Sequence, residues 1–144
     1  MERFDNFTFD EVVNHSQLDE KNRWLSILST LIGCQEIDEY KALLHFGLTP
    51  VEVKEMVYQA TAYLGIGRVF PFLKATNEIF TELGIALPVQ GQATTTTENR
   101  LEKGIEAQVA IFGEHMKDFY QSGDPESKQI HYWLTDNCFG NYYM

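Results

Sequence analysis

The chain has 144 residues, of which 44% are hydrophobic and 13% aromatic, enough for one compact domain with a core and too few for two ordinary ones. Only 22% of the residues are charged, which excludes a disordered chain, because that much apolar surface would collapse in water. The formal net charge of −10 repels phosphate backbones and anionic lipids. We therefore expect neither nucleic acid nor a membrane as a partner.

The compartment is indicated by what the sequence lacks. No apolar run reaches the roughly 18 residues that span a bilayer, and the first residues lack the profile of a signal peptide. We therefore expect a cytoplasmic protein. Cys34 and Cys138 form neither a Cys-x-x-Cys pair nor a disulfide framework, so we expect reduced thiols.

Apolar residues recur at three- and four-residue steps along most of the chain, which predicts an all-α fold. After a polar first segment, Asp19 is the expected N-cap of the first core helix. Thr49-Pro50-Val51-Glu52 is a capping box with proline at the first helical position. The expected core helices span residues 20–32, 50–63 and 68–83, and a shorter helix over 35–44 lies between the first two.

Residues 88–97 show no periodicity and are typical of a linker. Beyond them, the apolar spacing predicts one long amphipathic helix over 98–120, and Asp124-Pro125 is expected to cap a shorter helix. Two helices are thin for an independent core, so this part is expected to pack on the first part or on another copy. Because the apolar stripe would otherwise stay in water, we expect a homodimer or larger homo-oligomer built largely through residues 98–143.

Three segments of the chain resemble one protein family. They are Leu18-Asp19-Glu20-Lys21-Asn22-Arg23-Trp24-Leu25, then Gly47-Leu48-Thr49-Pro50-Val51-Glu52-Val53-Lys54-Glu55, then Tyr63-Leu64-Gly65. In this order they resemble the carboxymuconolactone decarboxylase family over roughly residues 18 to 83. The resemblance implies an alkylhydroperoxidase-like helical bundle around a helical hairpin, usually assembled as trimers or hexamers. The family includes a cofactor-free decarboxylase and thiol enzymes with a Cys-x-x-Cys and a nearby His.

The same resemblance implies a domain organisation. Some members of the family carry the helical unit twice, and residues 98–144 look like the lead-in to a second unit. The sequence ends before a second Asp-x-Lys-x-Arg helix. We therefore predict a complete carboxymuconolactone decarboxylase-like unit in residues 1–87, a linker over 88–97 and a partial second unit over 98–144.

The family usually supplies its catalytic His or its redox Cys pair between the first core helix and the Gly-Leu-Thr-Pro turn. Here that stretch holds Cys34, Glu36, Glu39 and His45. An ungapped alignment at Gly47 puts Glu39 where the decarboxylases tend to have His. A deletion in the same stretch would let His45 serve instead.

The enzyme hypothesis is cofactor-free acid/base chemistry on a small carboxylated or lactone substrate, which needs a proton-transfer group and a cation for the substrate carboxylate. His45 is a candidate acid/base group, with a carboxylate from Glu39 or Glu55. The alternative for His45 is a turn histidine, and the alternative for the arginines is a structural ion pair. The candidate substrate-binding residues are Arg23, Arg68 and Tyr63.

Two further functions stay open, and no metal ion or cofactor is expected. Cys34 follows Gly33 at a helix junction, where a helix N-terminus would favour a thiolate and a peroxidase-type reaction with an external reductant. The alternative for Cys34 is a buried, inert thiol. The other function is that of a non-catalytic oligomeric member of the family. Glu36, Asp38 and Glu39 have no His or Cys at ligand spacing, which favours a solvated helix start over a metal site.

Overall fold

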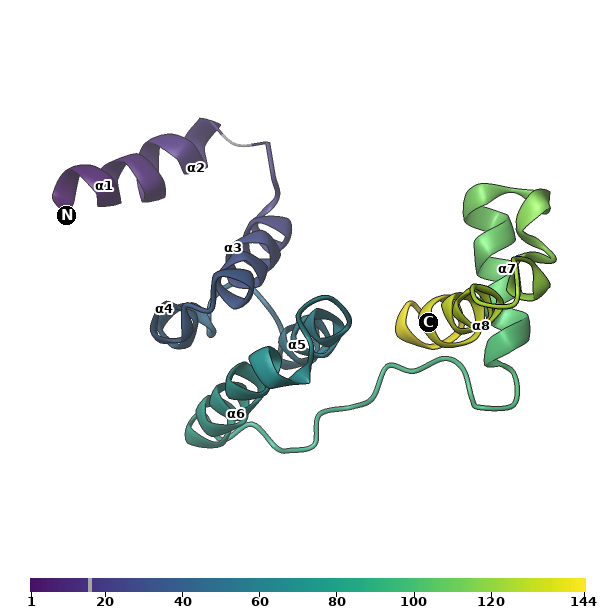
Figure 1. The fold of residues 1–144 in the computed structure, drawn as a ribbon. Coiled ribbons are helices and arrows are strands. Elements are labelled where there is room, and N and C mark those ends of the chain that lie inside the picture. Colours follow the sequence, from purple (N-terminus) through teal and green to yellow (C-terminus); the bar gives the residue numbers. More distant parts are fainter. Residues whose placement is uncertain (16) are drawn as a thin grey trace. The chain divides into compact units, whose positions relative to one another are not determined.

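The computed structural model describes residues 1–15 and 17–144, with residue 9 placed by its backbone alone. Every regular element in these residues is a helix and none is a strand, which confirms the all-α prediction (Figure 1). The chain forms two compact units, unit 1 over Met1–Val89 and unit 2 over Gln90–Met144. The helices of unit 1 are α1 (Glu2–Asn6), η1 (Phe7–Glu11), α2 (Val12–His15), α3 (Glu20–Cys34), α4 (Ile37–Leu43), α5 (Pro50–Leu64) and α6 (Ile66–Glu82).

The first residues of unit 1 form consecutive helical turns, α1, η1 and α2, where the sequence predicted only a polar segment. Phe4 and Phe7 are exposed on these turns, so the turns do not enter the core. The Arg23 guanidinium on α3 donates from Nη2 to the carbonyl oxygens of Val13 at 3.4 Å and Leu18 at 3.2 Å. These bonds hold the chain that leads into α3.

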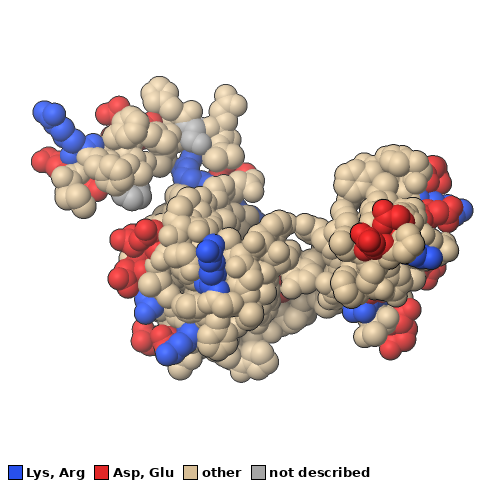
Figure 2. Space-filling view, viewed as in Figure 1, with Lys and Arg blue, Asp and Glu red and all other residues tan. Residues whose placement is uncertain are grey.

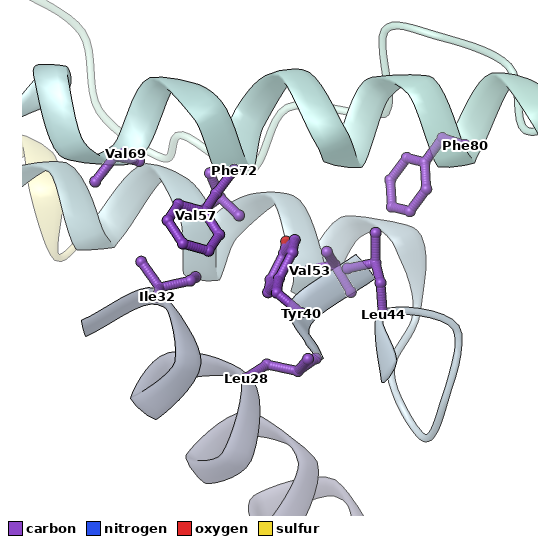
Figure 3. Packing of buried hydrophobic residues seen from close by; sticks show 9 residues of the cluster. All are labelled: Leu28, Ile32, Tyr40, Leu44, Val53, Val57, Val69, Phe72 and Phe80. Atoms are coloured by element: carbon purple, nitrogen blue, oxygen red, sulfur yellow. The ribbon is translucent and has the colours of Figure 1, made fainter. Parts of the chain in front are cut away.

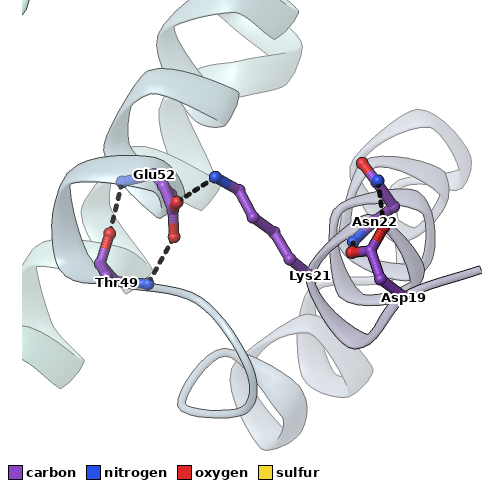
Figure 4. Close-up of polar contacts among 5 residues, drawn as sticks. All are labelled: Asp19, Lys21, Asn22, Thr49 and Glu52. Carbon is purple, nitrogen blue, oxygen red and sulfur yellow. Dashed lines mark hydrogen bonds and ion pairs between the residues drawn. The ribbon is translucent and has the colours of Figure 1, made fainter.

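Local capping explains why α3 and α5 begin where they do. Asp19 Oδ1 accepts a hydrogen bond from the Asn22 N–H at 2.9 Å, which confirms the predicted N-cap of α3. At α5, Thr49 Oγ1 accepts from the Glu52 N–H at 3.3 Å, and Glu52 Oε2 accepts from the Thr49 N–H at 2.9 Å (Figure 4). The predicted capping box is therefore present, with Pro50 at the first helical position.

The core of unit 1 lies among α3, α4, α5 and α6, and Figure 3 shows its side chains converging between these helices. The ring of Tyr40 packs edge-on against Phe72, with the ring centroids 5.1 Å apart. Thr76 Oγ1 donates to the Phe72 carbonyl, so the Tyr40 hydroxyl donates to Thr76 Oγ1, at 2.7 Å. Burial raises the pKa of Tyr40 to about 12. The buried apolar side chains are Leu28, Ile32, Tyr40, Leu44, Val53, Val57, Val69, Phe72 and Phe80.

Unit 2 corrects one sequence prediction and supports another. The single helix predicted over 98–120 is wrong, because Gly113 has a φ of 107° and ends the helix there. The shorter helix expected after Asp124-Pro125 is present over Lys128–Trp133. Asp124 caps the turn that leads into it, because its Oδ1 accepts from the N–H groups of Glu126 and Ser127 and its carbonyl accepts from the Lys128 N–H at 2.9 Å. The helices of unit 2 are α7 (Arg100–Phe112), η2 (Glu114–Met116), η3 (Phe119–Gln121), α8 (Lys128–Trp133) and η4 (Leu134–Tyr142).

Buried polar contacts join α7 to η4 inside unit 2. Thr135 Oγ1 donates to Gln108 Oε1 at 2.7 Å, and both side chains are buried. Arg100 Nη2 lies 2.8 Å from Asp136 Oδ2, and the Asp136 side chain is nearly buried. The shorter helix predicted from the sequence reached Leu134, and no element was predicted over the rest of η4.

Figure 2 shows the charged side chains on one face of the molecule. In this view acidic and basic side chains are interspersed, with uncharged surface between them. The chain has 21 acidic and 11 basic residues, and on this face the acidic side chains do not form a single block. Within residues 1–15 and 17–144, no helix is both long enough and apolar enough to cross a membrane.

Candidate functional site

A groove of about 640 Å³ runs between α3 and α5 in unit 1. The residues from α3 follow steps of three and four, so they form one face of that helix. Most of the lining is apolar, and the polar groups lie at intervals along it. The lining residues are Lys21, Leu25, Ser29, Ile32 and Gly33 from α3, and Glu52, Glu55, Met56, Gln59, Ala60, Tyr63 and Leu64 from α5.

An ion pair lies at one end of the groove. Lys21 Nζ lies 2.5 Å from Glu52 Oε1 (Figure 4), and both residues belong to the first turn of their helices. Both helices therefore begin at this end of the groove, and Gly33 and Leu64 lie toward its other end. The positive ends of two helix dipoles and the Lys21 ammonium meet at the first end.

The ion pair and the capping box together hold Glu52 ionised. The hydrogen bond from Lys21, followed by those from the backbone and side chain of Thr49, lowers the pKa of Glu52 to about 2. The same contact with Glu52 raises the pKa of Lys21 above its ordinary value. The carboxylate therefore binds two elements at once, the start of its own helix and the start of α3.

We expect unit 1 to lose stability as the pH falls from about 4.5 to about 2, because the pKa of Glu52 is lowered from 4.5 to about 2 on folding. A lowered carboxyl pKa gives stability above the unfolded value, and this stability disappears as the folded group is protonated. Glu52→Gln should therefore be less stable than the wild type at pH 7, and the difference should shrink toward pH 2. Denaturant titrations at a series of pH values, followed by the amide NMR signals of unit 1, measure this.

The matched control for that series is Glu78→Gln, since Glu78 is an exposed carboxylate on α6 with a looser ion pair, 3.8 Å from Lys74. It should leave the pH dependence of unfolding unchanged. Stability curves of the wild type and Glu52→Gln that run parallel from pH 7 to pH 2 would contradict the role given to Glu52.

Two of the site residues predicted from the sequence line this groove. Glu55 is half-buried in its wall, one turn after Glu52. Tyr63 is 69% exposed and lies at the end away from Lys21. The groove thus has a cation and two carboxylates toward one end, a mostly apolar middle that includes Ser29 and Gln59, and a phenol toward the other end.

The predicted histidine site is not assembled in the same place. His45 is exposed in the turn after α4, with its ring tilted against Phe46 at a centroid distance of 4.1 Å. Glu39 is exposed on α4. Neither residue lines the groove, and within the described part of the chain no hydrogen bond or ion pair joins His45 to Glu39 or Glu55. The pairing expected from the sequence is therefore not formed.

The two predicted cations also lie outside the groove. The guanidinium of Arg23 donates to backbone carbonyls ahead of α3, a structural role that differs from the ion pair given as its alternative. Arg68 is exposed in the first turn of α6. The cation that lines the groove is Lys21, which the sequence analysis did not single out as a site residue. Lys21 lies four residues before Leu25, on the groove face of α3. This spacing is the feature of the sequence that could have indicated Lys21 as a site residue.

The thiol predicted at a helix N-terminus lies at the opposite end of a helix. Cys34 is the last residue of α3 and is exposed, so the expectations of a helix N-terminus and of a buried thiol are both wrong. Cys138 is half-buried within η4 of unit 2. Both cysteines are free in the structure.

A search for metal sites and comparisons with known proteins add no assignment. The described residues contain no group of three or more His, Cys, Asp or Glu side chains that could hold a metal ion. No family model, curated protein or solved structure matches the chain.

Proposed function

We propose that the chain is a carboxymuconolactone decarboxylase-like protein that carries out acid/base chemistry on a small carboxylated or lactone substrate in the groove between α3 and α5. The observation that supports this is the presence of Glu55 and Tyr63 in one groove with the cation Lys21. Cofactor-free chemistry is what the resemblance to the family implies. The proposal moves the acid/base role from His45 to Glu55, because His45 does not line the groove.

The groove offers what a proton transfer at carbon requires. Its apolar middle, formed by side chains such as Leu25 and Met56, excludes water from the body of a ligand. In a decarboxylation the bond between the substrate carbon and its carboxylate breaks, carbon dioxide leaves, and the electron pair stays on the carbon. That carbon then takes a proton, and Glu55 is the half-buried carboxyl group in the wall that can exchange it.

Glu55→Gln is expected to lower turnover by about 10²- to 10⁴-fold, because an amide cannot exchange a proton, while substrate affinity changes little. Turnover is measured as carbon dioxide release from carboxylated lactones, and proton transfer as loss of the substrate proton signal in deuterated water. Glu78→Gln, which removes an exposed carboxylate on α6, should retain full activity. Equal turnover in wild type and Glu55→Gln would reject Glu55 as the acid/base group.

The thiol alternative is tested with the same assays. Cys34→Ser should keep the turnover of carboxylated lactones, because its side chain does not line the groove. Exposure of Cys34 gives a peroxide access to the thiol, and a sulfenic acid formed there would need an external thiol for its reduction. A peroxidase activity that Cys34→Ser abolishes, in a protein without lactone turnover, would favour the thiol alternative.

The homo-oligomer expected through residues 98–143 stays a prediction. It is supported by large apolar side chains that unit 2 leaves in solvent, each more than half exposed. Burying such side chains against another copy would gain roughly 1.5 to 3 kcal/mol each. These side chains are Ile111, Phe112, Ile130 and Trp133.

A further inference from the structure

The charges along the groove define where an anionic ligand group can bind. Lys21 is the one basic residue among the described residues that line it, and Glu52 and Glu55 are the acidic ones. A ligand carboxylate is repelled by both glutamates unless it contacts the ammonium itself. The N-termini of α3 and α5 lie at the same end as Lys21, and Asp19 and Glu52 already cap them, so Lys21 is the group in the lining that can contact a further anion.

Lys21 is available to a second acceptor. Its ammonium has three N–H donors and the structure gives it one acceptor, Glu52 Oε1 at 2.5 Å. The Lys21 side chain is 57% exposed, so the other donors are accessible from the mouth of the groove. Glu52 keeps its hydrogen bond with the Thr49 N–H through its other oxygen, so it can hold the ammonium in place while a ligand carboxylate also binds.

The length of the groove indicates the body of the ligand. Beyond Lys21 the lining from α3 runs from Leu25 to Gly33, over which the helix rises by about 12 Å, at 1.5 Å per residue. The lining beyond the charged end is mostly apolar, with Leu25 and Ile32 from α3 and Met56, Ala60 and Leu64 from α5, and it includes the polar side chains of Ser29 and Gln59. An apolar trough of this length is longer than a lactone ring and accommodates an extended chain of about ten carbon atoms.

We infer that Lys21 anchors the carboxylate of an elongated aliphatic monocarboxylate whose chain lies along the groove between α3 and α5. This inference rests on the groove of the proposed function and narrows its carboxylated substrates to the elongated type. It does not rest on the proton transfer assigned to Glu55. Lys21 is then a binding residue, and its ion pair with Glu52 is not required for binding.

The test compares two variants that break the same ion pair. Decanoate, below its micelle concentration, is titrated into the full chain, and binding is followed by NMR shifts of the groove residues and by calorimetry. Lys21→Met should weaken decanoate about tenfold to a hundredfold, because a charge-assisted hydrogen bond is lost. Glu52→Gln also breaks the ion pair but keeps the ammonium, so it should bind decanoate as tightly as the wild type or more tightly.

Further ligands and a control variant separate the carboxylate from the chain. Decanol should bind wild type and Lys21→Met equally, since it lacks the charge. Hexanoate should bind more weakly than decanoate, because it leaves part of the trough uncovered. Lys74→Met, which removes an exposed lysine on α6, should leave decanoate binding unchanged.

Three results would overturn the inference. Equal weakening by Lys21→Met and Glu52→Gln would show that Lys21 acts only through the ion pair. If decanoate shifts none of the NMR signals of the groove residues, this ligand class is excluded. The same conclusion holds if a measured mass shows that the protein is an oligomer whose second copy covers the groove. Equal affinities for decanol and decanoate in the wild type would show that Lys21 does not bind the ligand carboxylate. Decanoate binding that depends on Lys21, in a protein without turnover, would support this inference and reject only the proposed chemistry.

Discussion

Replacement of Gly104 with alanine is expected to unfold unit 2. Gly104 lies inside α7, and a Cβ atom built there overlaps the carbonyl oxygen of Thr135, which is backbone and cannot rotate away. The Gly140 nitrogen of η4 lies 3.0 Å from the same position. The side chain therefore forces α7 and η4 apart, and we expect a loss of at least about 3 kcal/mol of unfolding free energy.

Whether Gly104→Ala lowers or raises the unfolding free energy of unit 2 distinguishes the effect of close packing from that of helix propensity. In an open helix interior, glycine to alanine stabilises by about 1 kcal/mol, so packing must reverse the usual outcome. The readout is the dispersion of the amide signals of residues 90–144, together with thermal unfolding by circular dichroism. Gly91→Ala is the control within the same unit, because its Cβ would meet no atom within 4 Å. A Gly104→Ala protein as stable as Gly91→Ala would refute the close contact of α7 with η4.

Phe72→Ala is expected to cost unit 1 about 3 to 5 kcal/mol of unfolding free energy. Phe72 is 1% exposed in the centre of the core, and its ring is the edge-to-face partner of Tyr40. Alanine leaves a cavity between α4, α5 and α6 that the neighbouring rings cannot fill without moving. A loss of this size is a large part of the total stability of an ordinary domain, so unit 1 should be largely unfolded at moderate denaturant concentration.

The control for Phe72→Ala lies two residues earlier on the same helix. Phe70 is 58% exposed, so Phe70→Ala makes the same chemical change on the solvent face of α6 and should alter stability by no more than about 0.5 kcal/mol. Denaturant titrations followed by the amide signals of unit 1 give both values. Equal losses from the two variants would show that α6 does not bury the face that carries Phe72.

The candidate site could be predicted from the sequence only in part. Glu55 was identified as a carboxylate partner for His45, and Tyr63 belongs to a segment that carries the family resemblance; both line the groove. Lys21 belongs to the same resemblance, but its partner Glu52 is 31 residues away along the chain. Periodicity states which face of a helix a residue occupies. It does not state which other helix that face meets, so the ion pair and the groove were not foreseen.

What the sequence determined by itself is the local structure. The caps at Asp19 and Thr49 and the three- and four-residue apolar steps predict where α3 and α5 begin, because capping and helical periodicity depend on neighbours within one turn. The all-α class follows for the same reason. These features require no knowledge of how the helices pack.

The tertiary structure decided the end of α7, the close approach of η4 and the residues of the groove. Gly113 has a φ of 107°, which ends α7. The apolar residues beyond Gly113 keep a helical spacing, so the sequence pattern wrongly extended the predicted helix to residue 120. Glycine is needed at position 104 because the backbone of Thr135 packs directly against α7 there. His45 was a reasonable acid/base candidate along the chain, and it lies outside the groove because the turn after α4 exposes it. Contacts between distant segments depend on the packing of whole helices, and a local pattern does not contain that information.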